Sequence, residues 1–527
     1  MPDLIHELLL HSAEQSPHAE ALVYQDTRLD YGRLATRVRE CASLLLQLGL
    51  ARSQRVAIYM EKRPEAVISV FAAASAGGVF VPINPLLKPE QVAYILRDCN
   101  VSVLVTTAER LELLAPTLRE CPDLKAVVSV GGNTRSTDSL PIIAWEEAQT
   151  DAASAKPYRV IDTDMAAILY TSGSTGKPKG VVLSHRNMVA GARSVAQYLE
   201  NRPTDRILAA LPLSFDAGFS QLTTAFHVGA SVALINYLMP RDVLTAVERY
   251  GITGLTAVPP LWIQLAQLKW PESARKTLRY IANTGGRMPK ATLDALRTAL
   301  PQTLPYLMYG LTESFRSTYL PPSEVDRRPD SIGKAIPNAE VLVVREDGTL
   351  CGANEPGELV HRGALVSLGY WNDPEKTAER FKPAPGQPKG LVLPELAVWS
   401  GDTVRKDEEG FLYFISRRDE MIKTSGYRVS PTEVEEVVYA TGLVGEAAAL
   451  GIAHPVLGQA IVIVATSPAQ AKLDPQALLS QCRERLPAYM VPARILERKA
   501  SLPRNPNGKI DRKLLAQEFQ NLFEAAA

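Results

Sequence analysis

The segment from Thr171 to Gly180, TSGSTGKPKG, combines the residue types that bind a phosphate group. Its three glycines let the backbone approach an anion, and its hydroxyls and lysines supply donors and positive charge. A P-loop would need glycine five residues before the Gly-Lys pair and serine or threonine after it. Thr171 and Pro178 stand there instead, so a different phosphate cradle or a plain surface linker remains. The candidate phosphate ligands are Thr171, Ser172, Gly173, Ser174, Thr175, Gly176, Lys177 and Lys179.

A second candidate group is Tyr309-Gly-Leu-Thr-Glu313, which follows an expected strand. Residues at the carboxyl edge of an α/β sheet are where such proteins bind ligands. The Thr312 hydroxyl can donate to a phosphate. The Glu313 carboxylate can hold Mg²⁺, which takes one or two carboxylates beside phosphate oxygens. A solvated loop acid is the alternative for Glu313.

Three residues further along the chain can complete such a site. Asp402, in the sequence Ser-Gly-Asp-Thr, can accept both hydroxyls of a ribose, although an acid in a turn is also ordinary. Arg417 can contact ribose or phosphate, or pair with a surface acid. Lys509, in a Pro/Asn/Gly turn, can reach a developing negative charge, whereas most lysines in such turns are solvated.

Two stretches of alternating helix and strand patterns must position these residues. Such alternation predicts an α/β fold, with two doubly wound subdomains of parallel strands flanked by helices. The first stretch predicts helices at 32–48, 65–76 and 89–98 and strands at 55–59, 79–81 and 102–106. The second predicts strands at 206–211, 231–234, 254–257, 280–283 and 306–309, with helices at 221–228, 241–250, 260–268 and 289–300.

The pattern changes after residue 329. Strands expected at 341–345 and 357–361 predict hairpins of a small β subdomain. Ser430, Pro431 and Glu433 predict a helix start with a capping box. We place a hinge at Asp419, between an N-terminal domain of residues 1–418 and a small, mobile α+β C-terminal domain of residues 419–527.

The composition restricts the function classes. Lysine and arginine number 57, as do aspartate and glutamate, so neither nucleic acid nor an anionic membrane is expected as the main partner. The five cysteines are scattered without a CxxC pair, which suits a reducing compartment. The chain shows no signal-peptide pattern and no apolar run of spanning length, which predicts a cytoplasmic protein without membrane insertion. Both a monomer and a homodimer are compatible with the sequence.

Together, these motifs resemble the signature of the AMP-forming adenylating superfamily. That superfamily includes acyl-CoA synthetases, adenylation domains of nonribosomal peptide synthetases and firefly luciferase. The resemblance also covers residues 77–84, 283–286, 416–426 and 507–509, so it extends over nearly the whole chain. It implies two half-reactions. A carboxylate and Mg·ATP give acyl-AMP and pyrophosphate, and a thiol of CoA or of a carrier protein's phosphopantetheine then gives a thioester and AMP.

The resemblance also implies roles for individual residues. The loop at 171–180 would hold the pyrophosphate end of ATP, and Lys509 would act in adenylation together with Thr312 and Glu313. Rotation of the C-terminal domain about Asp419 would then remove Lys509 and bring Lys423 towards the thiol. The remaining nucleotide contacts implied are Gly285, Gly286, Tyr309, Gly310, Asp402 and Arg417.

The acyl pocket departs from the acyl-CoA synthetase pattern, where Phe-His is common. Here Phe215 is followed by Asp216, which resembles amino-acid-activating domains, in which the aspartate pairs with the substrate's α-ammonium. Helix N-capping is the alternative role for Asp216. Arg316 can meet a second substrate carboxylate or form a structural salt bridge. Ser220 and Trp262 complete the candidate substrate-binding residues.

The sequence constrains the enzyme subclass less tightly than it constrains the superfamily. Residues 218–262 and 315–319 resemble most closely the AMP-forming acyl-CoA ligases associated with exosortase A and exopolysaccharide clusters. The alternative is an amino acid ligase, for example one that loads proline on a carrier protein. A luciferase-like oxidase and a non-catalytic adenylate-binding protein are two further alternatives.

Overall fold

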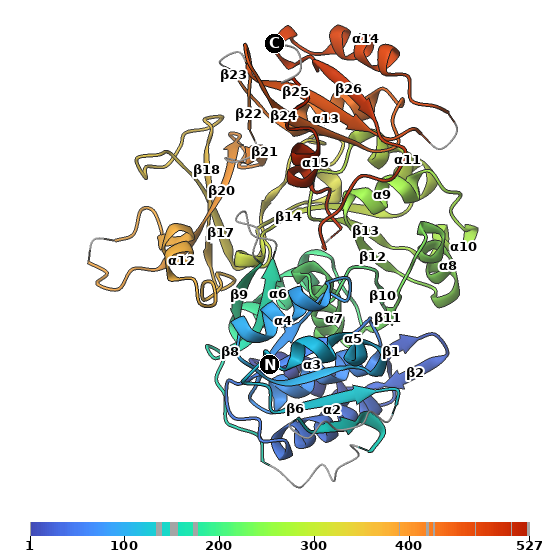
Figure 1. Cartoon of the computed structure of the whole chain (residues 1–527), viewed down its shortest axis with the longest axis vertical. Coiled ribbons are helices and arrows are strands. Elements are labelled where there is room, and N and C mark those ends of the chain that lie inside the picture. Colours follow the sequence, from blue (N-terminus) through green and yellow to red (C-terminus); the bar gives the residue numbers. More distant parts are fainter. Residues whose placement is uncertain are drawn as a thin grey trace.

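The structure, a computed structural model, describes residues 2–132, 140–147, 156–171, 178–388, 390–417, 421–424, 427–468, 471–506 and 508–523. The strands in these residues form four sheets. Figure 1 shows a large body built from the first two-thirds of the chain, a small sheet at its side, and the C-terminal segment packed on top. This mixed arrangement confirms the expected α/β fold class.

The first sheet has the order β7-β6-β5-β3-β4-β8-β9, and every neighbouring pair is parallel except the β8–β9 hairpin. Its central strands are almost fully buried, as expected for a parallel sheet covered on both faces. The strands are β3 (Arg55–Tyr59), β4 (Val79–Pro82), β5 (Val101–Thr107), β6 (Ala126–Val130), β7 (Ile142–Ala144), β8 (Met165–Thr171) and β9 (Lys179–Ser184). The helices before and between them are α1 (Ile5–Gln15), α2 (Tyr31–Gln47), α3 (Pro64–Ser75), α4 (Pro89–Asp98) and α5 (Ala108–Leu118), with a 3-10 turn η1 (Trp145–Glu147).

The second sheet has the order β16-β15-β14-β13-β12-β10-β11-β1-β2. Its strands are β1 (Glu20–Tyr24), β2 (Thr27–Asp30), β10 (Arg206–Ala209), β11 (Ser231–Leu234), β12 (Gly254–Ala257), β13 (Tyr280–Asn283), β14 (Leu304–Tyr309), β15 (Thr318–Leu320) and β16 (Lys334–Ala335). Its helices are α6 (His185–Tyr198), α7 (Asp216–Val228), α8 (Pro240–Tyr250), α9 (Pro259–Ala266), α10 (Glu272–Thr277) and α11 (Lys290–Ala299), with 3-10 turns η2 (Thr312–Ser314) and η3 (Pro322–Glu324).

The main hydrophobic core joins the two large sheets through the helices between them. Phe219 of α7 lies with its ring centroid 5.0 Å from that of Phe80 on β4, and the Phe71 and Phe226 rings are 5.4 Å apart. All four side chains are fully buried. Burial of such aromatic surface contributes strongly to stability, so these rings help to hold the two sheets together.

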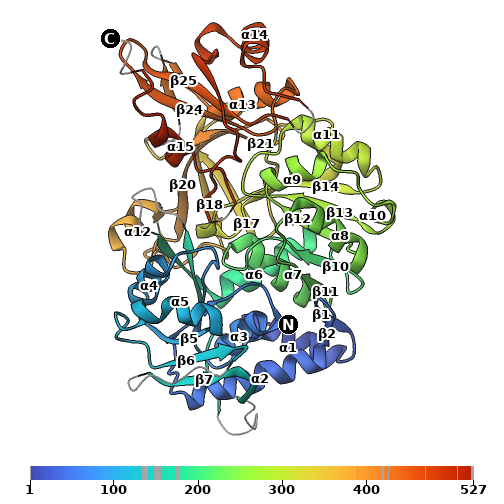
Figure 2. The ribbon, with the colours of Figure 1, turned by 45° about the vertical axis from the view of Figure 1, so that its right-hand side comes forward.

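Two smaller sheets follow. The first contains β17 (Ala339–Val344), β18 (Gly357–Gly363), β19 (Phe381–Pro383), β20 (Leu396–Lys406) and β21 (Leu412–Arg417), with α12 (Pro374–Arg380) beside it. The second contains β22 (Ile422–Thr424), β23 (Tyr427–Val429), β24 (Ala447–His454), β25 (Gly458–Ala465) and β26 (Arg494–Glu497). It is accompanied by α13 (Pro431–Ala440), α14 (Pro475–Arg485), α15 (Arg512–Glu518) and the 3-10 turn η4 (Ala488–Met490). Figure 2 shows this second sheet and its helices above the large body.

Two local expectations need correction, and one strand pairing had no local signal. The capping box at α13 is wrong: Ser430 is the N-cap, but its hydroxyl contacts the neighbouring Thr432 hydroxyl at 2.7 Å and makes no side-chain cap bond. Helix α7 begins at Asp216 and not at residue 221. The sequence did not indicate this start, because Gly218 in the first turn is a weak helix former. The hairpin β1–β2 joins the second sheet beside β11, a pairing across some 200 residues that local patterns cannot indicate.

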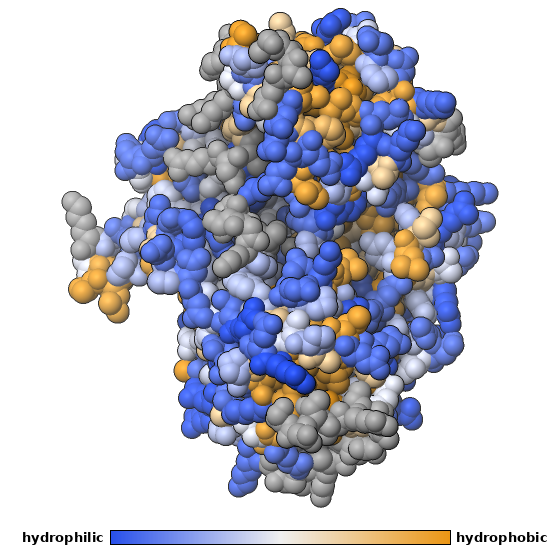
Figure 3. All heavy atoms as spheres, viewed as in Figure 1, coloured by the Kyte–Doolittle hydropathy of each residue, from blue (hydrophilic) through white to orange (hydrophobic). Residues whose placement is uncertain are grey.

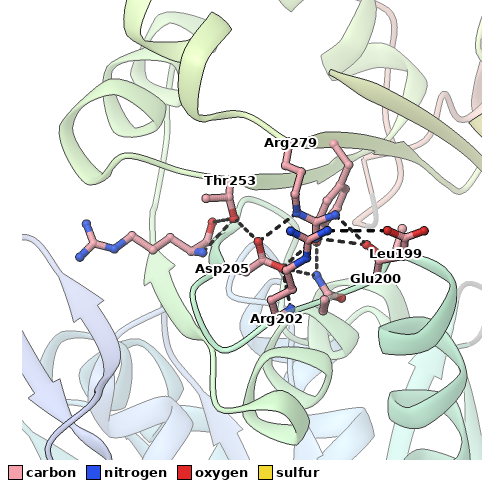
Figure 4. Close-up of polar contacts among 9 residues, drawn as sticks. Leu199, Glu200, Arg202, Asp205, Thr253 and Arg279 are labelled. Atoms are coloured by element: carbon pink, nitrogen blue, oxygen red, sulfur yellow. Dashed lines mark hydrogen bonds and ion pairs between the residues drawn. The ribbon is translucent and has the colours of Figure 1, made fainter. Parts of the chain in front are cut away.

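The amino ends of three strands of the second sheet are tied together by Asp205 (Figure 4). Its carboxylate accepts hydrogen bonds from Arg279 (2.8 Å) and from the Thr253 hydroxyl (2.8 Å), which precede β13 and β12. Arg279 also donates to the Leu199 carbonyl at 3.2 Å. Asp205 is 3% exposed, so this buried cluster fixes the sheet at the edge opposite Tyr309.

The loop before β20 projects from the body and carries exposed apolar side chains at its tip, visible as an orange patch in Figure 3. Val392 is 91% exposed and Leu393 80%. The stretch is rich in proline and glycine, which favour irregular surface loops. In the described part of the chain, none of the helices has both the length and the apolar character needed to cross a membrane.

Candidate active site

Asp402 of β20 connects the small sheet to the carboxyl end of β14. The Tyr309 hydroxyl donates to one carboxylate oxygen of Asp402, and Arg417 Nε donates to the other at 2.9 Å. Burial and the adjacent Asp402 charge raise the pKa of Tyr309 well above its ordinary value, so the phenol remains a donor. Each carboxylate oxygen keeps a further lone pair, which leaves Asp402 able to accept two ligand hydroxyls.

Glu313 lies in η2, directly after β14. The Tyr370 hydroxyl donates to Glu313 Oε1 at 2.5 Å, and burial together with the Glu313 charge raises the pKa of Tyr370. The Lys179 ammonium lies 5.3 Å from the centroid of the Tyr370 ring, within range of a cation–π contact. Tyr370 therefore links the end of the glycine-rich segment to the predicted metal-binding carboxylate.

The glycine-rich segment joins two strands of an antiparallel hairpin. Thr171 is the last residue of β8 and lies opposite Lys179, the first residue of β9. Residues 172–177, which include Ser172, Gly173, Ser174, Thr175, Gly176 and Lys177, lie outside the described residues.

Lys509 of the C-terminal segment extends into the large body. A Cβ placed on Gly285 would lie 3.1 Å from Lys509 Cε, and the Lys509 ammonium is 6.0 Å from the centroid of the Phe215 ring. Gly285 has a φ of +77°, a conformation that suits glycine. The absence of a side chain at Gly285 thus provides the space that the lysine occupies.

Two hydrogen bonds hold the C-terminal segment in this position. The Asn84 amide donates to the Pro506 carbonyl at 2.5 Å, and the Lys290 backbone N–H donates to Glu436 of α13 at 3.1 Å. Arg287 Nε lies 3.7 Å from a carboxylate oxygen of the same glutamate. The hinge expected at Asp419 lies outside the described residues, as does the side chain of Lys423 in β22.

The end of β13 offers an unused acceptor. Asn283 Nδ2 donates to the Gly286 carbonyl at 2.8 Å, whereas its buried Oδ1 has no hydrogen-bond partner in the described structure. A buried polar atom without a partner points to a missing ligand or water. At Gly310, which follows β14, a Cβ would lie 2.9 Å from the Arg316 backbone, so only glycine fits without a shift.

Asp216 and Arg316 form a buried ion pair. Arg316 Nη1 lies 2.5 Å from Asp216 Oδ2, the Thr312 hydroxyl donates to Asp216 Oδ1 at 3.3 Å, and both charged side chains are 3% exposed. The N-cap of α7 is Phe215, so the capping role considered for Asp216 is wrong. The structural salt bridge considered for Arg316 is present, and its partner is the candidate substrate ligand itself.

Phe315 holds Arg316 in place through a strained turn. Phe315 has φ +57° and ψ −56°, and the Arg316 N–H donates to the Ser314 carbonyl at 2.6 Å, which closes a γ-turn of the rare, positive-φ kind. The Phe315 ring fills the space beside Gly191 of α6, where a Cβ would lie 2.3 Å from a ring carbon. Packing against α6 therefore compensates the strain.

A cavity of about 20 Å³ lies beside the ion pair, large enough for roughly one water-sized group. Ser220 lies in its wall, and its hydroxyl is 3.3 Å from that of Thr224. Trp262 lies instead in the core around α8, α9 and α11, fully buried, and its indole N–H donates to the Ala257 carbonyl at 3.1 Å. The residues around the cavity are Val195, Leu199, Ile207, Ala217, Ser220, Gln221, Thr224, Thr256, Tyr280, Met308 and Arg316.

Comparison with known families matches residues 9–371 to the AMP-binding enzyme family and residues 433–509 to the AMP-binding enzyme C-terminal domain. This chain belongs to the AMP-binding enzyme family. An L-proline–[L-prolyl-carrier protein] ligase of Pseudomonas fluorescens is 31% identical over 98% of this chain and 99% of the relative. A ligase of the same name from Streptomyces coelicolor is 33% identical over 92% and 91%.

Solved structures agree with this assignment to the AMP-binding enzymes. The anthranilate CoA ligase AuaEII in complex with anthranoyl-AMP has a TM-score of 0.89 and 25% identity, and the match covers 100% of this chain and 99% of that one. The o-succinylbenzoate CoA synthetase MenE from Bacillus subtilis, in complex with ATP and magnesium, has a TM-score of 0.80 and 26% identity, covering 97% and 99%. The AMP-binding enzyme described here is an ATP-dependent ligase that forms AMP.

Two residues of this AMP-binding enzyme were not singled out from the sequence. Tyr370, the partner of Glu313, lies in a loop with only an adjacent tryptophan as a signal. Asn84 belongs to a matched motif, but its contact with Pro506 joins positions 422 residues apart. Neither partnership has a local sequence signal.

Proposed function

We propose that this AMP-binding enzyme is an acid–thiol ligase for a small carboxylic acid. The observation that carries the proposal is the position of Lys509 beside Gly285 and Phe215, where a cation can stabilise charge on the reacting phosphate. An oxygen of the acid attacks the α-phosphorus of ATP, and pyrophosphate leaves. A thiol then loses its proton and attacks the acyl carbon of acyl-AMP, and AMP leaves.

The residues present fit ATP and a magnesium ion. Asp402 has free lone pairs for ribose hydroxyls, and the unpartnered Asn283 Oδ1 is available to the nucleotide. Glu313 would hold Mg²⁺, whose charge would neutralise phosphate oxygens. Tyr370 orients that carboxylate. We assign Thr312 and Lys179 to donation to phosphate oxygens. We assign the undescribed residues 172–177 to the pyrophosphate end of ATP.

The thiol acceptor is CoA or a carrier protein's phosphopantetheine. Resemblance of residues 218–262 to acyl-CoA ligases of exosortase and exopolysaccharide clusters favours CoA. The two carrier-protein ligases among the relatives favour the second acceptor and give an amino acid–carrier protein ligase as the alternative function. We infer for either acceptor that a domain of residues 419–527 rotates about Asp419 against residues 1–418, so that Lys423 replaces Lys509.

Separate assays of the two half-reactions test the proposal. ATP–pyrophosphate exchange across uncharged, amino, aryl and dicarboxylic acids should identify an acid that drives adenylation. Thioester formation should then be followed by mass spectrometry with CoA and with holo carrier protein, using apo carrier protein as the control. Exchange without thioester formation on either thiol would contradict transfer. Absence of exchange with every acid, while ATP binds, would favour an adenylate-binding protein without catalysis.

A further inference from the structure

The carboxylate considered as the partner of a substrate ammonium already has a partner within the chain. Arg316 Nη1 lies 2.5 Å from Asp216 Oδ2, and both side chains are 3% exposed. Arg316 also lies in the wall of the 20 Å³ cavity. A buried ion pair is costly to break, because the charge left behind has lost both its partner and its water. The candidate acyl site therefore already has one positive charge, on Arg316, and one negative charge, on Asp216, and the two neutralise each other.

We propose that this balance selects a short carboxylic acid whose tail carries no charge. The inference rests on the proposed acid–thiol ligase function. An α-ammonium paired with Asp216 would leave the Arg316 guanidinium buried without a carboxylate. A second substrate carboxylate paired with Arg316 would leave Asp216 unpaired. An uncharged tail disturbs neither group, and the cavity beside Arg316, which has room for roughly one water-sized group, favours a short tail.

The backbone prevents Arg316 from simply turning away. Its Nη1 also donates to the Phe315 carbonyl at 2.7 Å, and Phe315 is fixed in its positive-φ turn by contact with Gly191. The guanidinium is thus held by a backbone hydrogen bond in addition to its contact with Asp216. Proline and alanine are accordingly predicted to be poor substrates, although two relatives are named for proline.

Pyrophosphate exchange on the full-length enzyme tests the inference. Acids with an uncharged tail, from acetate to hexanoate, are compared with alanine, proline, malonate and succinate, which each carry a second charged group. The best acid with an uncharged tail should exceed the best acid with a second charge by at least about a hundredfold in kcat/KM. This is the effect expected when a substrate charge has to break a buried ion pair. A higher kcat/KM for alanine or proline than for every uncharged acid would overturn the inference.

Two single variants give a reciprocal test. Arg316→Met frees Asp216 and should shift the preference towards alanine or proline by about tenfold or more. Asp216→Asn frees Arg316 and should shift it towards malonate or succinate. The double variant should favour uncharged acids again. Each ratio is measured within one preparation, so partial unfolding of a variant does not alter it. Unchanged ratios in both single variants would overturn the inference.

The exchange assay distinguishes failure of the proposed ligase function from failure of the uncharged-tail inference. If the wild type shows no exchange with any acid while it binds ATP, the ligase proposal itself is overturned, and the inference falls with it. If exchange occurs but amino acids are the best substrates, the ligase proposal stands and only the inference of an uncharged tail is wrong.

Discussion

The side-chain amide of Asn84 donates a 2.5 Å hydrogen bond to the carbonyl of Pro506, in the turn that carries Lys509. Asn84 is 5% exposed, and its Oδ1 accepts the Leu86 N–H at 2.9 Å, which fixes the orientation of the amide. The large body thus holds the C-terminal turn through a side chain that is itself held. Adenylation and the position of Lys509 should depend on this contact.

Asn84→Ala should slow pyrophosphate exchange by up to about tenfold, the effect expected for loss of one hydrogen bond. Thioester formation from supplied acyl-AMP should be unchanged or faster, because that step requires Lys509 to leave. The two rates are measured on the same preparation. Asn84→Asp, which keeps the shape and removes the donor, should behave like the alanine variant. Equal losses in both half-reactions would indicate general damage.

Lys509→Ala should reduce pyrophosphate exchange by a hundredfold or more, since a cation directed at developing phosphate charge is lost. Thioester formation from supplied acyl-AMP should largely survive. Lys513→Ala is the matched control, because it removes the same charge from an exposed position on α15. The role of Lys509 is contradicted if its variant keeps exchange or loses both half-reactions equally.

Tyr370→Phe removes the donor to Glu313 and should lower exchange about fivefold to tenfold, with a higher Mg²⁺ concentration needed for half-maximal rate. Exchange is measured across a Mg²⁺ titration. Tyr413→Phe is the control, since its hydroxyl donates to Asp407 at 3.0 Å in the small sheet. An unchanged Mg²⁺ dependence in the Tyr370 variant would contradict the assignment of Glu313 to the metal.

Arg279→Met leaves Asp205 buried without its cation and should lower the free energy of unfolding of the large body by about 3 kcal/mol. Arg297→Met, which breaks the exposed pair with Asp326, should lower the free energy of unfolding far less, because solvent screens that pair. Chemical denaturation followed by tryptophan fluorescence measures both. Similar losses of unfolding free energy in the two variants would show that the buried Asp205 pair contributes no more to stability than the exposed pair.

Stability should fall as the pH drops from 6.5 to 4. Burial lowers the pKa of His361 to about 4. Between pH 6.5 and 4 its imidazole is therefore protonated in the unfolded chain and neutral in the folded chain. The stability contributed by neutral His361 is present above pH 6.5 and is lost as the pH falls towards 4. His361→Gln should remove about 3 kcal/mol of this pH dependence, measured by chemical denaturation at pH 6.5 and at pH 4.

The sequence predicted local elements well where pattern and chain breaks coincide. Strand β3 and helix α4 have the expected bounds, because an apolar run in one case and Pro89 in the other mark them. The candidate nucleotide residues at 171–180, 285–286 and 309–313 were found because each group follows or ends an expected strand, whereas Asp402 lies within β20. Pairings across the chain were not predictable: Asp216 and Arg316 are 100 positions apart, and nothing local indicates the positive φ of Phe315.

Gly191 has a consequence for how acid preference can change in related enzymes. Any side chain at this position on α6 would displace the Phe315 ring and, through the turn, the guanidinium of Arg316. Divergence in substrate choice can therefore begin in a helix outside the residues that line the cavity. A mutant library confined to those lining residues would sample only part of the route to a new acid, and position 191 belongs in its design.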